Sequence, residues 1–308
     1  MNNKLTLLAL ILIVGTSSTL FFYAFYNKIN LNSNSNASNN FFTQQDLSSN
    51  KPLFKFIVLA DTHLNSDAFS YIRNKVNDLD AEFVAHLGDH TNFGTTIELE
   101  QSTTLLKSLG LPYYTLAGDH DIAETQSLEN FNKFFTTPSE FIYKGVVVKL
   151  LNNPYNIQPF SEYQIQSVLL KLTDSDIVLS SQPIYVEKDN FFNYKFMGSL
   201  ENIENLSVTN KELLKRYNAQ SKIIVNSLRE TSKNTLVISG DHHRSAKFSD
   251  PINSLVSYHI VGALSKSIFL GSKEIPQKSL QSQRFSIIEV FERDSKFSFE
   301  VKEHIIEN

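Results

Sequence analysis

Apolar residues in this chain recur in short continuous runs that alternate with longer segments of mixed polarity. Five runs rich in β-branched or aromatic residues are typical of buried strands, namely 54–60, 82–88, 112–118, 176–181 and 235–240. The segments between them predict helices over 67–79, 96–109, 125–135, 161–172 and 208–230. Three later segments alternate apolar and polar residues with little helix between them, which indicates an antiparallel sheet over 254–262, 284–292 and 296–304. The pattern therefore predicts an α/β fold with mixed sheets.

The N-terminal segment differs from the rest, because residues 5–26 contain no charged side chain. A helix of this length, at about 1.5 Å per residue, crosses a hydrocarbon core of about 30 Å. We expect residues 1–27 to be an uncleaved membrane anchor, and a cleaved signal peptide is the alternative. Residues 28–51 are rich in Asn and Ser and predict a flexible linker. Residues 52–308 then form one domain, which we expect outside the cytoplasm on a single-pass anchor in the cell membrane, or secreted after cleavage.

Composition narrows the possible partners and ligands of this domain. The chain has 308 residues, 41% of them hydrophobic, so it can bury a large core. The formal net charge is −4 and no dense run of Lys or Arg is present, so no nucleic acid partner is expected. Cysteine is absent, and a metal site would have to use histidine, carboxylate, amide or water.

Acidic residues and histidines follow four of the predicted strands at the point where each strand ends. The clusters are Asp61 with His63, Asp89 with His90, Asp119 with His120 and Asp121, and Asp241 with His242 and His243. A single cluster would be weak evidence, because aspartate is common in turns and at helix N-termini. In an open α/β sheet the carboxyl ends of the strands meet at one crevice, so four clusters predict one site. Carboxylates and imidazoles together suit ions such as zinc, iron and manganese.

Residues 54–264 resemble the calcineurin-like metallophosphoesterases, whose motifs run in the order D-x-H, G-D, G-N-H-[DE], a histidine before x-P, and G-H-x-H. The resemblance implies two mixed β-sheets packed as a sandwich and flanked by helices. It also implies hydrolysis of a phosphorylated substrate, a phosphodiester or a phosphomonoester, at two divalent or trivalent metal ions (Mn, Fe, Zn, Mg or Ca). Position by position, it implies that Asp61, His63 and His243 bind the first metal, that Asp89 bridges both, and that His120 donates a proton and is oriented by Asp121.

Three positions depart from these motifs, and all three fall on the second metal. Asp119 stands in place of an asparagine, Ser181 in place of the histidine before x-P, and Asp241 in place of the first histidine of G-H-x-H. The two aspartates resemble the PhoD-type alkaline phosphodiesterase branch, and we expect both to remain ligands. Such an oxygen-rich site favours Mn²⁺, Mg²⁺ or Ca²⁺. The alternative is a degraded relative that holds one metal and acts as a binding or structural protein.

The remaining histidines are expected to have other roles. His86 lies inside an apolar run and predicts a hydrogen-bonded core residue. We expect His90 and His242 beside the ligands but not among them, and His304 in solvent. His259 could line the crevice or pack in a sheet. Two further features are left open: Arg244 could contact a phosphate or form a surface salt bridge, and segments 136–165 and 183–210 are expected to supply the pocket walls.

Overall fold

The computed structural model describes residues 51–154, 161–170, 172–184, 208–270, 273–279 and 281–306. The expected membrane segment and nearly all of the expected linker lie outside these residues. Within the described part of the chain, no helix combines the length and the apolar character that crossing a membrane requires. The domain boundaries expected from the sequence therefore stay a prediction.

The first sheet has five strands and joins the earliest described segments to the latest ones. Its strand order is β13 (Lys296–Ile305), β12 (Arg284–Arg293), β1 (Phe54–Leu59), β2 (Phe83–His86) and β3 (Tyr113–Thr115). The strands β1, β2 and β3 run parallel, because the crossover helices α2 (Ser66–Leu79) and α3 (Thr96–Lys107) lie between them in sequence. The strands β12 and β13 are antiparallel to each other, and β12 is antiparallel to β1.

The second sheet has six strands, and the four central strands are parallel to one another. Its strand order is β4 (Glu140–Tyr143), β5 (Val146–Leu151), β6 (Ile177–Ser180), β7 (Thr235–Ser239), β9 (Val256–Ile260) and β8 (Ala246–Ser249). The strands β5, β6, β7 and β9 are parallel, whereas β4 and β8 pair antiparallel at the two edges. Both sheets are therefore mixed.

The remaining described elements are helices of very different length and one small hairpin. The helices are α4 (Phe131–Phe134), α5 (Glu162–Leu169) and α7 (Val208–Arg229), and the 3₁₀ turns are η1 (His120–Ile122), η2 (Leu172–Asp174) and η4 (Gln277–Ser279). The hairpin pairs β10 (Ser267–Leu270) with β11 (Lys273–Pro276).

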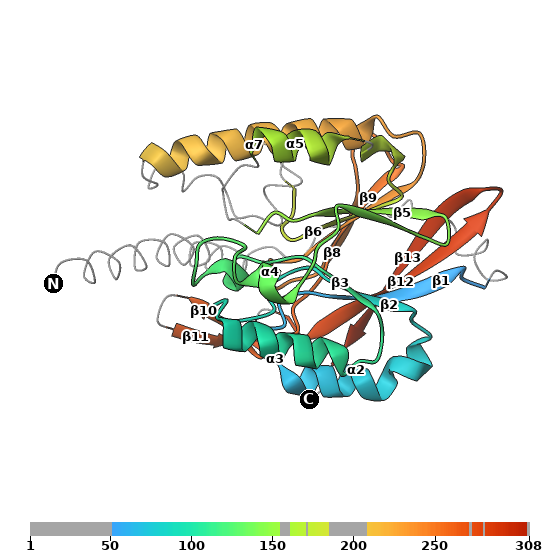
Figure 1. Ribbon diagram of the computed structural model, residues 1–308. Coiled ribbons are helices and arrows are strands. Elements are labelled where there is room, and N and C mark those ends of the chain that lie inside the picture. Colours follow the sequence, from blue (N-terminus) through green and yellow to red (C-terminus); the bar gives the residue numbers. More distant parts are fainter. Residues whose placement is uncertain are drawn as a thin grey trace.

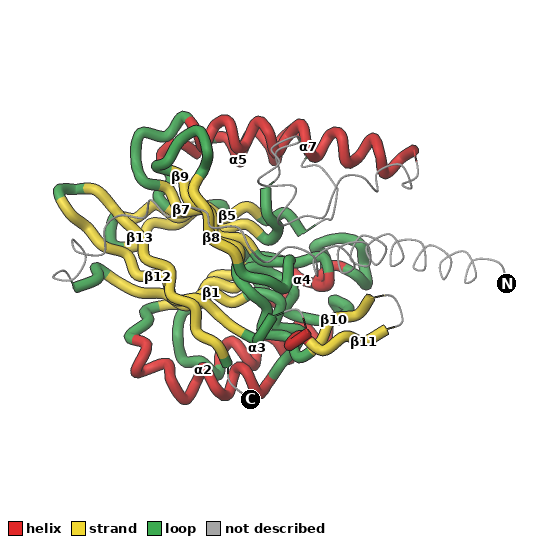
Figure 2. The backbone as a smooth tube through the Cα atoms, turned by 180° about the vertical axis from the view of Figure 1, so that it is seen from behind, coloured by secondary structure: helices red, strands yellow, loops and turns green. Residues whose placement is uncertain are grey.

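The two sheets pack face to face, and helices cover their outer faces. Along β1, Phe56 and Val58 point into the core between the sheets, whereas Ile57 and Leu59 pack toward α2 and α3. On the second sheet, α5 and α7 cover the outer face. Figure 1 shows these helices on opposite sides of the molecule, and Figure 2 shows the two layers of strands between them from behind. Strands buried on both faces read as continuous apolar runs. The predicted sandwich of two mixed sheets with flanking helices is confirmed.

The structure differs from the predicted arrangement in three details. The segment 136–165, for which no strand was predicted, contains the strands β4 and β5, because Lys149 within "VVVKLL" interrupts the apolar signal. The helix expected at 125–135 is a single turn, α4, because Gln126 has a left-handed backbone (φ 51°) that no helix continues through. Strand β9, expected in an antiparallel sheet, pairs antiparallel with β8 on one side but parallel with β7 on the other.

Three of the other histidines can be compared with their expected positions. His86 is fully buried and hydrogen-bonded, as predicted. His259 packs between the sheets, where its Nε2 lies 2.7 Å from Ser286 Oγ. His304, which was expected in solvent, is partly covered because its ring stacks on Phe285 at a centroid distance of 5.1 Å.

Candidate metal centre

Loops from both sheets meet at the carboxyl ends of their parallel strands. Asp61 and His63 follow β1, Asp89 follows β2, and His243 follows β7 in the second sheet. The backbone N–H of Asp61 donates to the Gly88 carbonyl at 3.1 Å, which joins the first two loops. The backbone N–H of Asp241 donates to Asp61 Oδ1 at 3.1 Å, which joins the two sheets. The convergence of acidic residues and histidines predicted from the four strand ends is thus observed.

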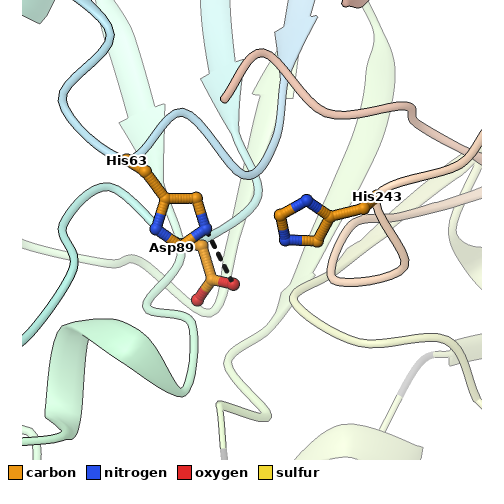
Figure 3. Close-up of side chains that lie close together, drawn as sticks. All are labelled: His63, Asp89 and His243. Carbon is orange, nitrogen blue, oxygen red and sulfur yellow. Dashed lines mark ion pairs between the residues drawn. The ribbon is translucent and has the colours of Figure 1, made fainter. Parts of the chain in front are cut away.

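A first group of possible metal ligands consists of His63, Asp89 and His243. Each offers one ligand atom, and these atoms all lie within 4.8 Å of one another. His63 Nε2 lies 3.8 Å from Asp89 Oδ2, and His243 Nε2 lies 4.0 Å from Asp61 Oδ1. Figure 3 shows His63, Asp89 and His243 pointing toward one another. Two buried atoms at this place, Asp61 Oδ2 and His63 Nε2, have no hydrogen-bond partner among the described residues.

A second group consists of Asp89, Asp119 and His120, whose ligand atoms also lie within 4.8 Å of one another. Asp89 therefore belongs to both groups, as a carboxylate that bridges two ions would. Asp241 belongs to neither group: its Oδ1 accepts a hydrogen bond from Gln182 Nε2 at 3.3 Å. Ser181 Oγ is buried and has no hydrogen-bond partner among the described residues.

The electrostatics of the two groups favour a bound cation. Burial, followed by the charge of Asp119, raises the pKa of Asp61 to about 7. The same two causes raise the pKa of Asp89 and of Asp241 well above their ordinary value near 3.8. Burial lowers the pKa of His243 to about 4, so this ring is neutral near pH 7. Clustered carboxylates and neutral imidazoles with unpaired atoms are the donor set that divalent metals use, so the residues fit a metal.

The backbone at this place is unusual. Five of the residues expected as ligands have a left-handed backbone: Asp61 (φ 50°), His63 (φ 44°), Asp89 (φ 55°), Asp241 (φ 75°) and His243 (φ 53°). Such a conformation costs a non-glycine residue roughly 1–3 kcal/mol, and it persists only where the surrounding structure fixes it. Its concentration at three strand ends marks the cluster as a functional site.

His120 is held by a residue that the motifs did not indicate. The His120 ring lies beside that of His63, with their centroids 4.7 Å apart. Its Nδ1 lies 2.8 Å from the backbone carbonyl of Asn92, so Nδ1 carries the hydrogen and donates it. Asn92 follows Asp89 by three residues, and only that spacing after the G-D motif could have drawn attention to it.

Asp121 does not orient the His120 ring, in contrast to our expectation, because its carboxylate is hydrogen-bonded elsewhere. It accepts backbone N–H groups of His90 at 3.2 Å, Thr91 at 3.0 Å and Gly118 at 2.8 Å. Asp121 therefore fixes the backbone of the loops after β2 and β3, and its influence on His120 runs through that backbone.

The buried imidazoles of His86 and His90 pack beneath the loops that carry the candidate ligands after β1 and β2. The rings of His86 and His90 stack with centroids 3.5 Å apart. The Gly88 N–H donates to His86 Nδ1, so His86 Nε2 carries the hydrogen and donates to Thr62 Oγ1 at 3.0 Å. Thr62 stands between Asp61 and His63, so the hydrogen bond from His86 helps to hold the first loop. His90 turns its ring away from the candidate ligands: its Nε2 lies 3.0 Å from the Leu116 carbonyl.

His242 and Arg244 flank His243 in the loop after β7. His242 Nε2 lies 3.9 Å from Asp241 Oδ2, and burial lowers its pKa to about 3. Arg244 is partly buried.

Comparisons with known proteins agree with this architecture. The family described as calcineurin-like phosphoesterase matches residues 54–250. The uncharacterized protein YvnB of Bacillus subtilis (strain 168) is 23% identical over 234 residues, which are 70% of this chain. The chain spans only 17% of the length of YvnB.

Two solved structures share the fold. A dimetal phosphatase from Danio rerio aligns with a TM-score of 0.51 and 13% identity, over 82% of this chain and 96% of its own. The purple acid phosphatase PPD1 from yellow lupin (Lupinus luteus) seeds aligns with a TM-score of 0.50 and 12% identity, over 81% of this chain and 51% of its own. Because the family match extends over more than half of the sequence, the chain belongs to the calcineurin-like phosphoesterase family.

Proposed function

We propose that the protein hydrolyses a phosphoester at two metal ions held by the converging loops. The observation that carries this proposal is the position of Asp89, which is shared by two groups of possible ligands. In the first site, Asp61, His63, Asp89 and His243 would hold the ion. In the second site, Asp89, Asp119 and Asp241 would do so. When bound, two such ions supply positive charge for phosphate oxygens and lower the pKa of a water for attack on phosphorus.

Two residues near the ions, His120 and Asp121, would donate a proton and hold the loops in place, respectively. Because His120 Nδ1 donates to the Asn92 carbonyl, Nε2 is the atom that can hold a proton for the leaving oxygen. Proton donation of this kind contributes about 10²- to 10⁴-fold to a rate. Asp121 keeps the loop that carries His120 in register with the loop that carries Asp89.

The second site is proposed to prefer a hard cation. Asp119 and Asp241 bring two carboxylates where the family motif has neutral ligands, and Ser181 replaces a third neutral ligand. Oxygen donors with negative charge favour Mn²⁺, Mg²⁺ or Ca²⁺ over Zn²⁺.

The location and the substrate are also proposals. The uncharged segment 5–26 supports an anchor in the cell membrane with the domain outside the cytoplasm, and secretion after cleavage is the alternative. The substrate would carry a phosphoester, either a diester or a monoester. We expect no nucleic acid partner, because the net charge of the chain is −4.

A second candidate is a binding or structural protein that holds a single metal. Two observations favour it: Asp241 lies outside both groups of possible ligands, and Ser181 supplies no imidazole. The first site does not depend on either residue.

The test is metal analysis and hydrolysis by the full-length protein purified in detergent. We expect two equivalents of Mn²⁺ per chain and turnover of bis(p-nitrophenyl) phosphate or p-nitrophenyl phosphate. Asp89→Asn should remove both the second equivalent and the turnover while the fold is retained, because an amide lacks the charge that holds two cations together. Turnover near that of the wild type in Asp89→Asn would contradict the two-metal proposal. One equivalent of metal without hydrolysis would favour the binding protein.

A further inference from the structure

Gln277 is a buried amide whose two ends both contact His243. It lies in η4, and its side chain is fully buried. Its Nε2 donates to the His243 carbonyl at 2.8 Å and to the Gln281 carbonyl at 3.2 Å. Its Oε1 lies 3.1 Å from His243 Nδ1. A single side chain thus contacts both the backbone and the ring of one candidate ligand.

This arrangement determines which nitrogen of His243 carries the hydrogen. A carbonyl oxygen only accepts, so the end of the Gln277 amide that faces the His243 carbonyl must be the donor, Nε2. The other end is then Oε1, which also only accepts, so His243 Nδ1 must carry a hydrogen. Ser265 Oγ, 3.3 Å from the same nitrogen, is a second neighbour and can accept as well. In a neutral imidazole the lone pair then lies on Nε2.

His243 Nε2 is the atom that faces the other candidate ligands. It lies 4.0 Å from Asp61 Oδ1, and His243 groups with His63 and Asp89. We propose that Gln277 is a positioning residue that fixes the tautomer and the orientation of the His243 ring for metal binding. The proposal rests on the proposed function, because it requires that His243 bind a metal. Partners on the far nitrogen of a metal-binding histidine typically change metal affinity 10- to 100-fold when removed.

The position of Gln277 in the chain adds to this inference. The family match ends at residue 250, so Gln277 lies beyond the segment that carries the family motifs. A second glutamine shortly after η4 contacts the same loop in a similar way. Gln281 Oε1 accepts the backbone N–H of Ser245, and Gln281 Nε2 donates to Ser245 Oγ. The segment around η4 therefore holds the loop after β7 at two points, and only the Gln277 contact reaches a candidate ligand.

The test compares two matched substitutions in the full-length protein. Gln277→Met removes both amide ends and keeps a side chain of similar length, and Gln281→Met does the same four residues later. With Zn²⁺ as the probe, we expect isothermal titration calorimetry to give an affinity about 10- to 100-fold weaker for Gln277→Met and within about twofold of wild type for Gln281→Met. Equal affinities in the two variants and the wild type would overturn the proposal.

A measurement on the wild type keeps the inference testable if Gln277→Met does not fold. In ¹⁵N-labelled, Zn²⁺-loaded protein, imidazole ¹⁵N shifts should show His243 with hydrogen on Nδ1 and metal on Nε2. The signal is assigned by its loss in His243→Gln. Metal on Nδ1, or a ring free of metal in Zn²⁺-loaded protein, would refute the role of Gln277. If the wild type binds no metal at all, the proposed function fails, which is a different result.

Discussion

Replacing Gly118 with alanine is expected to displace the shared carboxylate of Asp89. A Cβ atom at residue 118 would lie 2.0 Å from Asp89 Oδ1 and 2.3 Å from the backbone nitrogen of Asp89. The carboxylate would have to retreat by more than about 1 Å to reach ordinary van der Waals separation. The backbone contact means that a rotation of the Asp89 side chain alone does not remove the overlap.

The expected losses of stability and of activity follow from two separate effects. Overpacking of this kind costs about 1–3 kcal/mol of folding free energy. A misplacement of about 1 Å in a catalytic group can lower a rate about 10²-fold. We therefore expect Gly118→Ala to fold with a lowered Tm, to bind Mn²⁺ more weakly, and to lose at least about 100-fold in kcat/KM.

The matched control is Gly110→Ala, at the other end of β3. Unlike Gly118, Gly110 has a left-handed backbone (φ 70°), and a Cβ there would meet no atom within 4 Å. The strain of a left-handed alanine costs about 1–2 kcal/mol. This variant should lose stability while its metal affinity and kcat/KM stay those of the wild type. If Gly118→Ala kept full metal binding and turnover, or if both variants lost them equally, the reasoning about Asp89 would be wrong.

Three further predictions concern metal preference, pH and the membrane. Asp241→His should shift the ratio of Zn²⁺ to Mn²⁺ affinity toward Zn²⁺ in competition titrations, since imidazole suits zinc better than another carboxylate does; an unchanged ratio would remove Asp241 from the site. In metal-stripped protein the Tm should fall as the pH rises from about 4 to about 7 and then level off, because in this range folded Asp61, with a pKa of about 7, still holds a proton that the unfolded chain, near 3.8, has released. A flat or rising Tm over this range would contradict the raised pKa. The full chain should resist carbonate extraction and be released from membranes by detergent; recovery of a protein that begins near residue 20 would indicate a cleaved signal peptide.

Much of the sandwich could be predicted because the central strands are buried on both faces. Residues 54–59 show this best: every residue except Lys55 is buried, and the four residues after Lys55 are apolar without interruption, which favours a strand buried on both faces. Strand β5 has the same burial, yet Lys149 within it hid the pattern. That lysine is tolerated because its Nζ donates to the Leu170 carbonyl at the end of α5, a contact between distant residues that no local pattern reveals.

The sequence could indicate which residues gather at the candidate site, but it could not indicate most of their hydrogen-bond partners. Parallel strands bring Asp61, Asp89 and His243 together whatever their sequence separation, so strand ends alone indicate them. The partners of these residues are different, because a hydrogen-bond acceptor such as the Asn92 carbonyl carries no sequence signature. The role expected for Asp121 was wrong for the same reason, since neighbouring residues need not share a hydrogen bond.

The division of the site between the two sheets has a consequence for the order of events during synthesis. Asp61, Asp89 and Asp119 leave the ribosome early, but His243 and its partner Gln277 follow more than a hundred residues later. A partly made chain can present carboxylates to a passing cation, yet it lacks the imidazole that completes the first site. The proposed first site would therefore be complete only after β7 and the loop that follows it have been made, although two of its ligands, His63 and Asp89, come from the first sheet.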